Sequence, residues 1–379
     1  MFEDAATVDY TTHLAQRVTM IEASGIRKIF DLAATIKDAI DLSIGQPDFD
    51  VPEPVKRAAV EAINAGFNRY PPSVGWPDLR QAVLDRYHKL HGVRPEDCII
   101  TCGTSGGLTL SLLALVNPGD EVLVPDPFFV SYKHLTTMCG GKAVFYNTYP
   151  RFSPNVAEIE KLISPRTKVI LLMSPGNPTG GVWTDKQKRD LADVARAKNV
   201  IVLSDEVYEL FVYGEPQRSM VAHYPEGTLS AGGFSKTLSI PGWRLGWITG
   251  PKELIQQMTK LQQFTFVAAP NPVQRAVLKG FDVDLSGHVA AYRKKRDFLV
   301  QGLRRAGYEC EVPGGAFYLF PYVPAKYKNG QEFVEAAIAR RMLLVPGHVF
   351  SSRDTHFRIS YAAPDKMLAE ALEVFKTLR

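Results

Sequence analysis

The sequence predicts an α/β fold with a mainly parallel seven-stranded central sheet flanked by helices, plus a smaller α+β domain. Three observations support this prediction. Short apolar runs alternate with amphipathic stretches between residues 96 and 250, a pattern typical of alternating strands and helices. Turn-forming segments rich in glycine and proline separate the runs, as at 117–120 and 174–181. Beyond residue 271 the pattern changes to a long, charged amphipathic stretch followed by short mixed segments.

Each predicted element follows from the local pattern. The apolar runs that we interpret as strands lie at 98–102, 121–125, 142–146, 168–173, 200–204, 228–231 and 245–249. We expect a helix at about 287–306 and an amino-terminal helix at about 18–34 that packs with the carboxy-terminal part. The prediction is a large domain at 46–285 and a small domain built from 1–45 and 286–379.

The bulk composition limits the class of protein. A chain of 379 residues with 45% hydrophobic content can bury a large core. The net charge of +4 is spread thinly, so we expect no nucleic-acid partner. No apolar run reaches membrane-spanning length, and the first 19 residues lack the apolar core of a signal peptide. The scattered cysteines indicate neither a disulfide framework nor a metal site, and we expect a cytoplasmic protein: Cys98, Cys102, Cys139 and Cys310.

Lys236 is the first candidate for chemistry. It closely follows the strand-like segment 228–231, where the end of a buried strand would deliver its amine into a cleft. A lysine must be neutral to attack a carbonyl, which requires desolvation or a neighbouring cation. Arg244 would supply that cation or hold a phosphate, and pyridoxal 5'-phosphate (PLP) is a phosphate-bearing aldehyde that accepts a lysine. The alternative is a solvated lysine beside a turn.

Two further segments suit the ring and the phosphate of PLP. Asp205 follows the apolar run 200–203 and would stabilise a protonated ring nitrogen; otherwise it is a helix cap or a core carboxylate. Gly103, Thr104 and Ser105 lead from a strand into a helix, where backbone amides cradle phosphates. Ser235 and Arg244 would complete this cradle. The alternative for the glycine-rich turn is a tight connection without a ligand.

A PLP site also needs an aromatic face for the ring and an arginine for the substrate carboxylate, and the sequence offers candidates for both. A ring needs an aromatic face, and Phe128 and Phe129 lie on the loop after a strand, although either would also serve as core. The α-carboxylate of an amino acid calls for a bidentate arginine, which Arg358 would provide. The alternative for Arg358 is a surface cross-strand pair.

Six ordered motifs together resemble the fold type I PLP enzymes of the class I/II, aspartate-aminotransferase-like family. They are Ile-Gly-Gln-Pro-Asp-Phe at 44–49, Tyr-Pro-Pro-Ser-Val-Gly at 70–75, Ser-Pro-Gly-Asn-Pro-Thr-Gly at 174–180, Ser-Asp-Glu-Val-Tyr at 204–208, Ser-Lys at 235–236 with Gly-Trp-Arg-Leu-Gly at 242–246, and Phe-Arg at 357–358. Their order and spacing across the chain are more specific than any single motif.

The resemblance implies a role for each residue of the site. Lys236 would form an imine with PLP and act as general base, Asp205 would pair with the ring nitrogen, and Phe129 would stack on the ring. Asn177 and Tyr208 would form hydrogen bonds with the ring oxygen of PLP. The implied phosphate ligands are Gly103, Thr104, Ser105, Ser235 and Arg244, with Tyr70 reaching the phosphate of a neighbouring subunit in a homodimer. The implied holders of the substrate carboxylate are Asn177, Arg358 and the backbone at Gly45.

The implied activity is transfer of the amino group of an L-amino acid to a 2-oxo acid. Ser105 stands where some aspartate-using bacterial relatives have lysine, which weakens an aspartate assignment and leaves a neutral, aromatic or sulfur-containing substrate. One alternative is a β-eliminating carbon–sulfur lyase of the same fold. Another is a non-enzymatic PLP-binding regulator, although no segment outside the family-like span is long enough for a winged helix-turn-helix.

Overall fold

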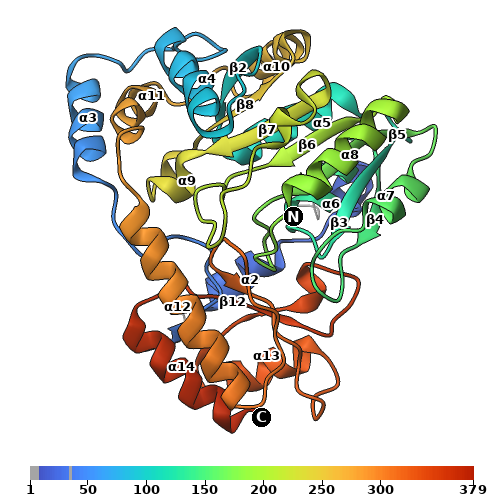
Figure 1. The fold of residues 1–379 in the computed structure, drawn as a ribbon, viewed down its shortest axis with the longest axis vertical. Coiled ribbons are helices and arrows are strands. Elements are labelled where there is room, and N and C mark those ends of the chain that lie inside the picture. Colours follow the sequence, from blue (N-terminus) through green and yellow to red (C-terminus); the bar gives the residue numbers. More distant parts are fainter. Residues whose placement is uncertain (1–7, 34–35) are drawn as a thin grey trace, which may run out of the picture.

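The computed structural model describes residues 8–33 and 36–379, and residues 1–7 and 34–35 of the predicted small-domain segment lie outside this range. A seven-stranded sheet, ordered β2-β8-β7-β6-β5-β3-β4, forms its centre (Figure 1). Its strands are β2 (Asp97–Cys102), β3 (Glu121–Asp126), β4 (Lys142–Asn147), β5 (Thr167–Met173), β6 (Ile201–Asp205), β7 (Thr228–Gly233) and β8 (Leu245–Gly250). All neighbours pair in parallel except β8, which runs antiparallel to β2 and β7. The predicted mainly parallel sheet is confirmed, and every strand end lies within two residues of its predicted position.

Helices cover both faces of this sheet, which explains why most residues of its inner strands are buried. Ile99 and Leu203 point to the face covered by α5 (Gly103–Leu115) and α10 (Lys252–Thr265). Their sequence neighbours Ile100 and Val202 point to the opposite face. There they pack with α4 (Pro77–His91) and α8 (Asp185–Lys198). The remaining helices of this region are α3 (Glu53–Asn64), α6 (Ser131–Met138), α7 (Val156–Leu162), α9 (Phe234–Thr237) and α11 (Asn271–Ala276), with short 3-10 turns η2 (Met220–Ala222), η3 (Pro225–Gly227), η4 (Pro241–Trp243) and η5 (Val277–Gly280).

The amino-terminal segment packs against the carboxy-terminal part of the chain. β1 (Ile40–Asp41) pairs with β10 (Met342–Leu343), and α2 (Gly25–Ala33) lies beside β11 (Val345–Pro346) (Figure 1). The long α12 packs on α14. The elements not yet placed are α12 (Ser286–Arg305), β9 (Tyr318–Leu319), α13 (Gly330–Ile338), η6 (Gly347–Val349), β12 (Phe357–Ser360) and α14 (Asp365–Thr377), and the sheet order is β11-β12-β9.

The single amino-terminal helix predicted at 18–34 is wrong. The structure has η1 (Tyr10–His13), a short α1 (Gln16–Thr19) and a separate α2, and residue 34 lies outside the described residues. Ser24 starts the second helix, because its hydroxyl accepts a hydrogen bond from the Arg27 amide as an N-cap does. α2 packs with the carboxy-terminal part as expected, whereas α1 packs against α6.

Candidate active site

The direction of the strands explains why distant segments meet. Six of the seven strands run the same way, so their carboxyl ends lie at one edge of the sheet. β8 runs the opposite way, which brings its amino end, just after Arg244, to the same edge. Ligands of open α/β sheets bind beyond this edge.

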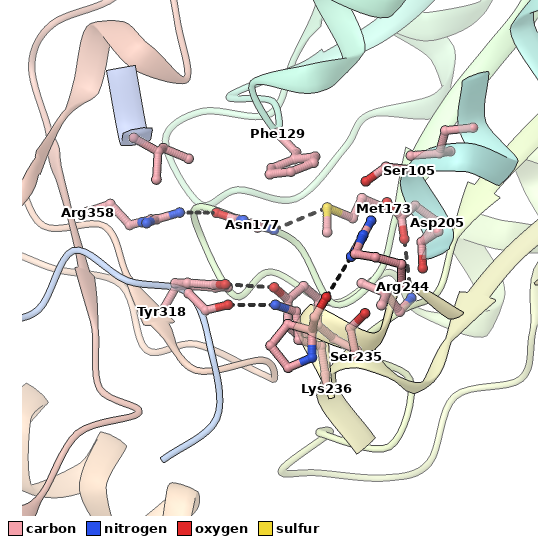
Figure 2. Close-up of a pocket in the computed structure, with 17 residues that line it drawn as sticks. Ser105, Phe129, Met173, Asn177, Asp205, Ser235, Lys236, Arg244, Tyr318 and Arg358 are labelled. Atoms are coloured by element: carbon pink, nitrogen blue, oxygen red, sulfur yellow. Dashed lines mark hydrogen bonds between the residues drawn. The ribbon is translucent and has the colours of Figure 1, made fainter. Parts of the chain in front are cut away.

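A pocket at this edge is lined by eleven of the thirteen predicted site residues. They are Gly45, Thr104, Ser105, Phe129, Asn177, Asp205, Tyr208, Ser235, Lys236, Arg244 and Arg358. Figure 2 shows Arg358 on one side and Ser105 with Arg244 on the other, with Phe129 and Lys236 between them. Gly103 and Tyr70 do not line this pocket.

Lys236 lies on α9, directly after β7, and its surroundings favour the neutral amine. Its Nζ donates to the carbonyl oxygen of Gly45 at 2.6 Å, and it is largely shielded from solvent. Burial, together with the positive charges of Arg358 and Arg244, lowers the pKa of Lys236 to about 8 against the opposing effect of Asp205. The solvated-lysine alternative is therefore wrong for this structure.

If Lys236 forms the imine with PLP that the resemblance implies, the rate at which the protein captures PLP should follow this titration. The folded-state pKa is depressed, so the neutral fraction of Lys236 grows as the pH rises through about 8. Below that value the capture rate should increase by about tenfold per pH unit and then level off. Stopped-flow absorbance between pH 6.5 and 9.5 measures it. In Arg358→Gln the rise should move to higher pH, because that variant removes a charge that lowers the pKa; a flat profile in the unmodified protein would contradict the assignment.

Asp205 is the last residue of β6 and is 2% exposed. Burial raises the pKa of Asp205 to about 6, and two hydrogen bonds limit the rise. The Tyr132 hydroxyl donates to Oδ2 at 2.8 Å, and the Val207 amide donates to Oδ1 at 3.2 Å. The carboxylate is thus held in one orientation beside the pocket.

The side chain of Glu206, the residue after Asp205, points away from the pocket. Glu206 Oε1 accepts hydrogen bonds from Ser204, Ser219 and the Met220 amide, all away from the pocket. Adjacent residues at a strand end face opposite ways, so only one carboxylate of the acidic pair enters the site.

One end of the pocket is suited to a phosphate, because it combines the amino terminus of a helix with a cation. Thr104 and Ser105 are in the first turn of α5, whose amides have no helical partner and attract anions. Gly103 has φ +70°, and a Cβ there would lie 2.6 Å from Nη2 of Arg244, so glycine lets the guanidinium approach. Arg244 is fixed by donation from Nη1 to the carbonyl of Pro241 at 2.8 Å. The buried Ser235 adds a hydroxyl.

Arg358, on β12, is 1% exposed, so the surface-pair alternative is wrong. Nη1 donates to Oδ1 of Asn177 at 3.0 Å, and Nη2 donates to the carbonyl of Ser43. The guanidinium carbon lies 4.8 Å from the ring centre of Tyr318. Nε is buried with no hydrogen-bond partner among the described residues. A buried, under-satisfied guanidinium calls for an anion.

The two candidate phenylalanines differ in role. Phe128 is 6% exposed and stacks on Phe145, with ring centres 5.1 Å apart, so it belongs to the core. Phe129 lines the pocket, and its ring meets the ring of Tyr132 edge-on, with ring centres 5.6 Å apart. The sequence placed both on the right loop but did not distinguish them.

Tyr318 is a pocket residue that the sequence analysis missed. Its hydroxyl lies 2.6 Å from that of Tyr208. A side chain at Gly45 would collide with this hydroxyl, so the glycine keeps room for the tyrosine pair. The glycine-rich segment at 313–318 signals a special loop but does not indicate where that loop packs. The other residues missed are Ile26, Leu108, Met173, Val207 and Pro241.

The chemical groups of these residues match those that PLP requires. A shielded amine, a buried carboxylate, an aromatic face and a tyrosine hydroxyl surround one space, and a helix amino terminus with an arginine closes one end. The unsatisfied Nε of Arg358 on the other side is suited to an amino-acid carboxylate.

Comparison with known proteins agrees with this geometry. Residues 37–375 match the family described as aminotransferase class I and II. The aromatic-amino-acid aminotransferase 2 of Thermococcus litoralis is 35% identical over 375 residues, covering 95% of this chain and 96% of the relative. The aspartate aminotransferase of Pyrococcus abyssi is 34% identical over 375 residues with the same coverage. The structure of aspartate aminotransferase from Thermus thermophilus with maleate has a TM-score of 0.92 at 32% identity, covering 97% of this chain and 99% of that one.

These matches confirm the fold type I architecture and the use of PLP. The chain belongs to the class I and II aminotransferases, the PLP-dependent enzymes that transfer amino groups from amino acids to 2-oxo acids.

Proposed function

We propose that the chain performs amino transfer with Lys236 as the covalent anchor of the cofactor and the base that moves the substrate proton. The observation that carries this proposal is that the shielded amine of Lys236, the carboxylate of Asp205 and the buried guanidinium of Arg358 line one pocket. An amine whose pKa is near 8 is suited both to attack a carbonyl and to exchange a proton near neutral pH.

Each residue has a proposed task. PLP supplies an aldehyde that condenses with amines and a ring that withdraws electrons from bonds at Cα. Asp205 stabilises the positive charge of the ring nitrogen, and Phe129 supports the ring face. Arg358, oriented by Asn177, binds the substrate carboxylate, which places Cα for deprotonation by the Lys236 amine. The Tyr208 hydroxyl donates a hydrogen bond to the ring oxygen of PLP. The hydroxyl of Tyr318 is in turn hydrogen-bonded to the hydroxyl of Tyr208.

We propose a neutral substrate, with an aromatic, aliphatic or sulfur-containing side chain. The three cationic side chains that line the pocket among the described residues are Lys236, Arg244 and Arg358, and each already has a proposed task. Apolar side chains, including Ile26 and Leu108, form much of the remaining lining. A second carboxylate would be desolvated there without a cation from this chain. The names of the relatives include both aromatic and aspartate enzymes and do not decide the substrate.

A half-reaction screen tests reaction and donor together. Each of the twenty amino acids is mixed with the PLP-loaded protein, without an oxo acid, while the cofactor absorbance and released products are followed. We expect stoichiometric 2-oxo acid and faster conversion with L-phenylalanine or L-methionine than with L-aspartate. Faster conversion with L-aspartate would contradict the substrate proposal alone. Continuous release of pyruvate and ammonia from cysteine conjugates would instead favour the lyase alternative, which the aminotransferase relatives do not support.

We propose that the enzyme works as a homodimer in which Tyr70 reaches the partner's phosphate site. Tyr70 and Phe264 are 85% and 86% exposed in the single chain. The segment that carries Tyr70 is held against α11, because Asn271 Nδ2 donates to the carbonyl of Arg69 at 2.8 Å. Phe266, just after α10, lies near Gly106 in the first turn of α5. Tyr70 and Phe264 are thus exposed rings of the kind that an interface covers, and Phe266 lies at the start of the helix that forms the phosphate end of the pocket.

Mixing two inactive variants tests the dimer. Lys236→Ala and Tyr70→Ala chains are co-expressed with different tags, and the heterodimer is purified. Its Tyr70→Ala chain has an intact Lys236 and would receive Tyr70 from the other chain. We expect about half of the activity of the unmodified dimer per heterodimer, because one of two sites is complete. A heterodimer no more active than the two parent variants would contradict the shared site, and a mass equal to one 42.0 kDa chain would contradict the dimer.

Two coarser proposals complete the account. We retain the division into a large domain at 46–285 and a small domain from 1–45 and 286–379; limited proteolysis should cut first near 285, and first cuts within the central sheet would contradict it.

We also propose a cytoplasmic location, because all four cysteines are free, as in a reducing compartment. Recovery of the protein from a secreted fraction would contradict that location. Within the described residues, no helix has the length and apolarity needed to cross a membrane.

A further inference from the structure

We infer that Tyr132 is a positioning residue that sets the orientation of both Asp205 and Phe129, the partners proposed for the ring nitrogen and the ring face. The inference rests on the proposed function of the pocket. Tyr132 itself does not line the pocket; it lies behind it, in the first turn of α6. Its effect on the reaction would therefore pass through the two residues that it holds.

The first contact is a buried hydrogen bond. Tyr132 is fully buried, and its hydroxyl donates to Oδ2 of Asp205 at 2.8 Å. With the Val207 amide on Oδ1, both carboxylate oxygens have a donor, so the plane of the carboxyl group is fixed. A buried carboxylate that loses such a donor is left under-solvated.

The second contact joins Tyr132 to the aromatic face. The Tyr132 and Phe129 rings meet edge-on, with centres 5.6 Å apart and planes at 79°. The Tyr132 amide also donates to the carbonyl of Phe129 at 3.0 Å. One residue thus contacts two parts of the pocket, Asp205 at the end of β6 and Phe129 on the loop after β3.

The hydroxyl has a chemical consequence beyond packing. Burial already raises the pKa of Asp205 to about 6, and the Tyr132 hydrogen bond opposes that rise. Without the hydroxyl the carboxyl pKa would rise further, toward the range in which the group is neutral near pH 7. A neutral carboxyl group does not stabilise a positively charged ring nitrogen.

Tyr132→Phe tests this inference, because it removes only the hydroxyl and keeps the ring against Phe129. Tyr146→Phe is the matched control: Tyr146 is also buried, and its hydroxyl donates to the Leu171 carbonyl at 2.8 Å, outside the pocket. We expect Tyr132→Phe to weaken PLP binding to the apoprotein by about tenfold and to lower kcat by about 10- to 100-fold, with a small change in KM. The control should change each by less than about threefold.

A double variant separates positioning from a general loss of structure. If Tyr132 acts through Asp205, then Tyr132→Phe should add almost nothing to Asp205→Ala, in PLP affinity as in kcat. Additive effects, or equal behaviour of Tyr132→Phe and Tyr146→Phe, would overturn the inference while leaving the proposed function intact. Failure of the unmodified protein to bind PLP or to transaminate would instead refute the proposed function.

Discussion

Lys236→Ala is expected to lower transamination by about 10⁴-fold or more. A placed proton-transferring side chain contributes about 10²–10⁴-fold, and the variant also loses the covalent attachment of the cofactor. Lys236 is the one lysine that lines the pocket among the described residues, so no other amine of that part of the chain can take its place. Steady-state assays with the best donor from the half-reaction screen measure the loss, and visible spectra report whether PLP still binds covalently.

A lysine outside the pocket provides the control. Lys260 is exposed on α10, where its Nζ donates to Gln257. Lys260→Ala should keep both the visible absorbance and the rate within about twofold. If Lys236→Ala transaminates at a similar rate to Lys260→Ala, the assignment of the anchoring amine is wrong.

Asp205→Ala should be the second most damaging substitution, with a loss of about 10³-fold or more in kcat. Removing one preorganised group that stabilises developing charge costs about 10²–10³-fold, and the variant also leaves the Tyr132 hydroxyl without its acceptor. Retention of PLP should weaken as well, because the ring nitrogen loses its ionic partner. Dialysis against buffer without PLP, followed by absorbance, measures this retention.

Asp126→Asn is the matched control for Asp205. Asp126 is also a buried carboxylate at the end of a strand of the same sheet, β3, and burial also raises its pKa. It does not line the pocket, so its replacement should change kcat by only a few-fold. Near-normal kinetics of Asp205→Ala would rule out its role at the ring nitrogen.

The central sheet and the centre of the site could be predicted because both depend on local patterns. Parallel strands are buried on both faces, so most of them appear as short apolar runs. Asp205 and Lys236 follow such runs directly, and the shared edge of a parallel sheet then brings them together. The positive φ of Gly103 and the close approach of Arg244 give the glycine of this turn a physical reason, whereas its predicted contact with a phosphate stays a prediction.

The missed residues depend on packing between segments far apart in the sequence. Tyr318 reaches Tyr208 across 110 positions, and Tyr132 reaches Asp205 across 73. Each looks like an ordinary core tyrosine in its own segment. The amino-terminal helix was predicted too long because the apolar pattern continues through Ile21, whereas the cap at Ser24 restarts the helix. Tyr70 is exposed in a single chain, and the role proposed for it requires a second one.

The most direct test of the account is to locate the attachment of PLP. The loaded protein is reduced with borohydride, digested and mapped by mass spectrometry, with the Asp205→Ala protein treated in parallel. The account predicts a single phosphopyridoxyl group on the peptide that carries Lys236, at full occupancy in the unmodified protein and reduced occupancy in the variant. Attachment at another lysine, or no attachment, would contradict the proposal that the Lys236 amine and the Asp205 carboxylate hold one cofactor between them.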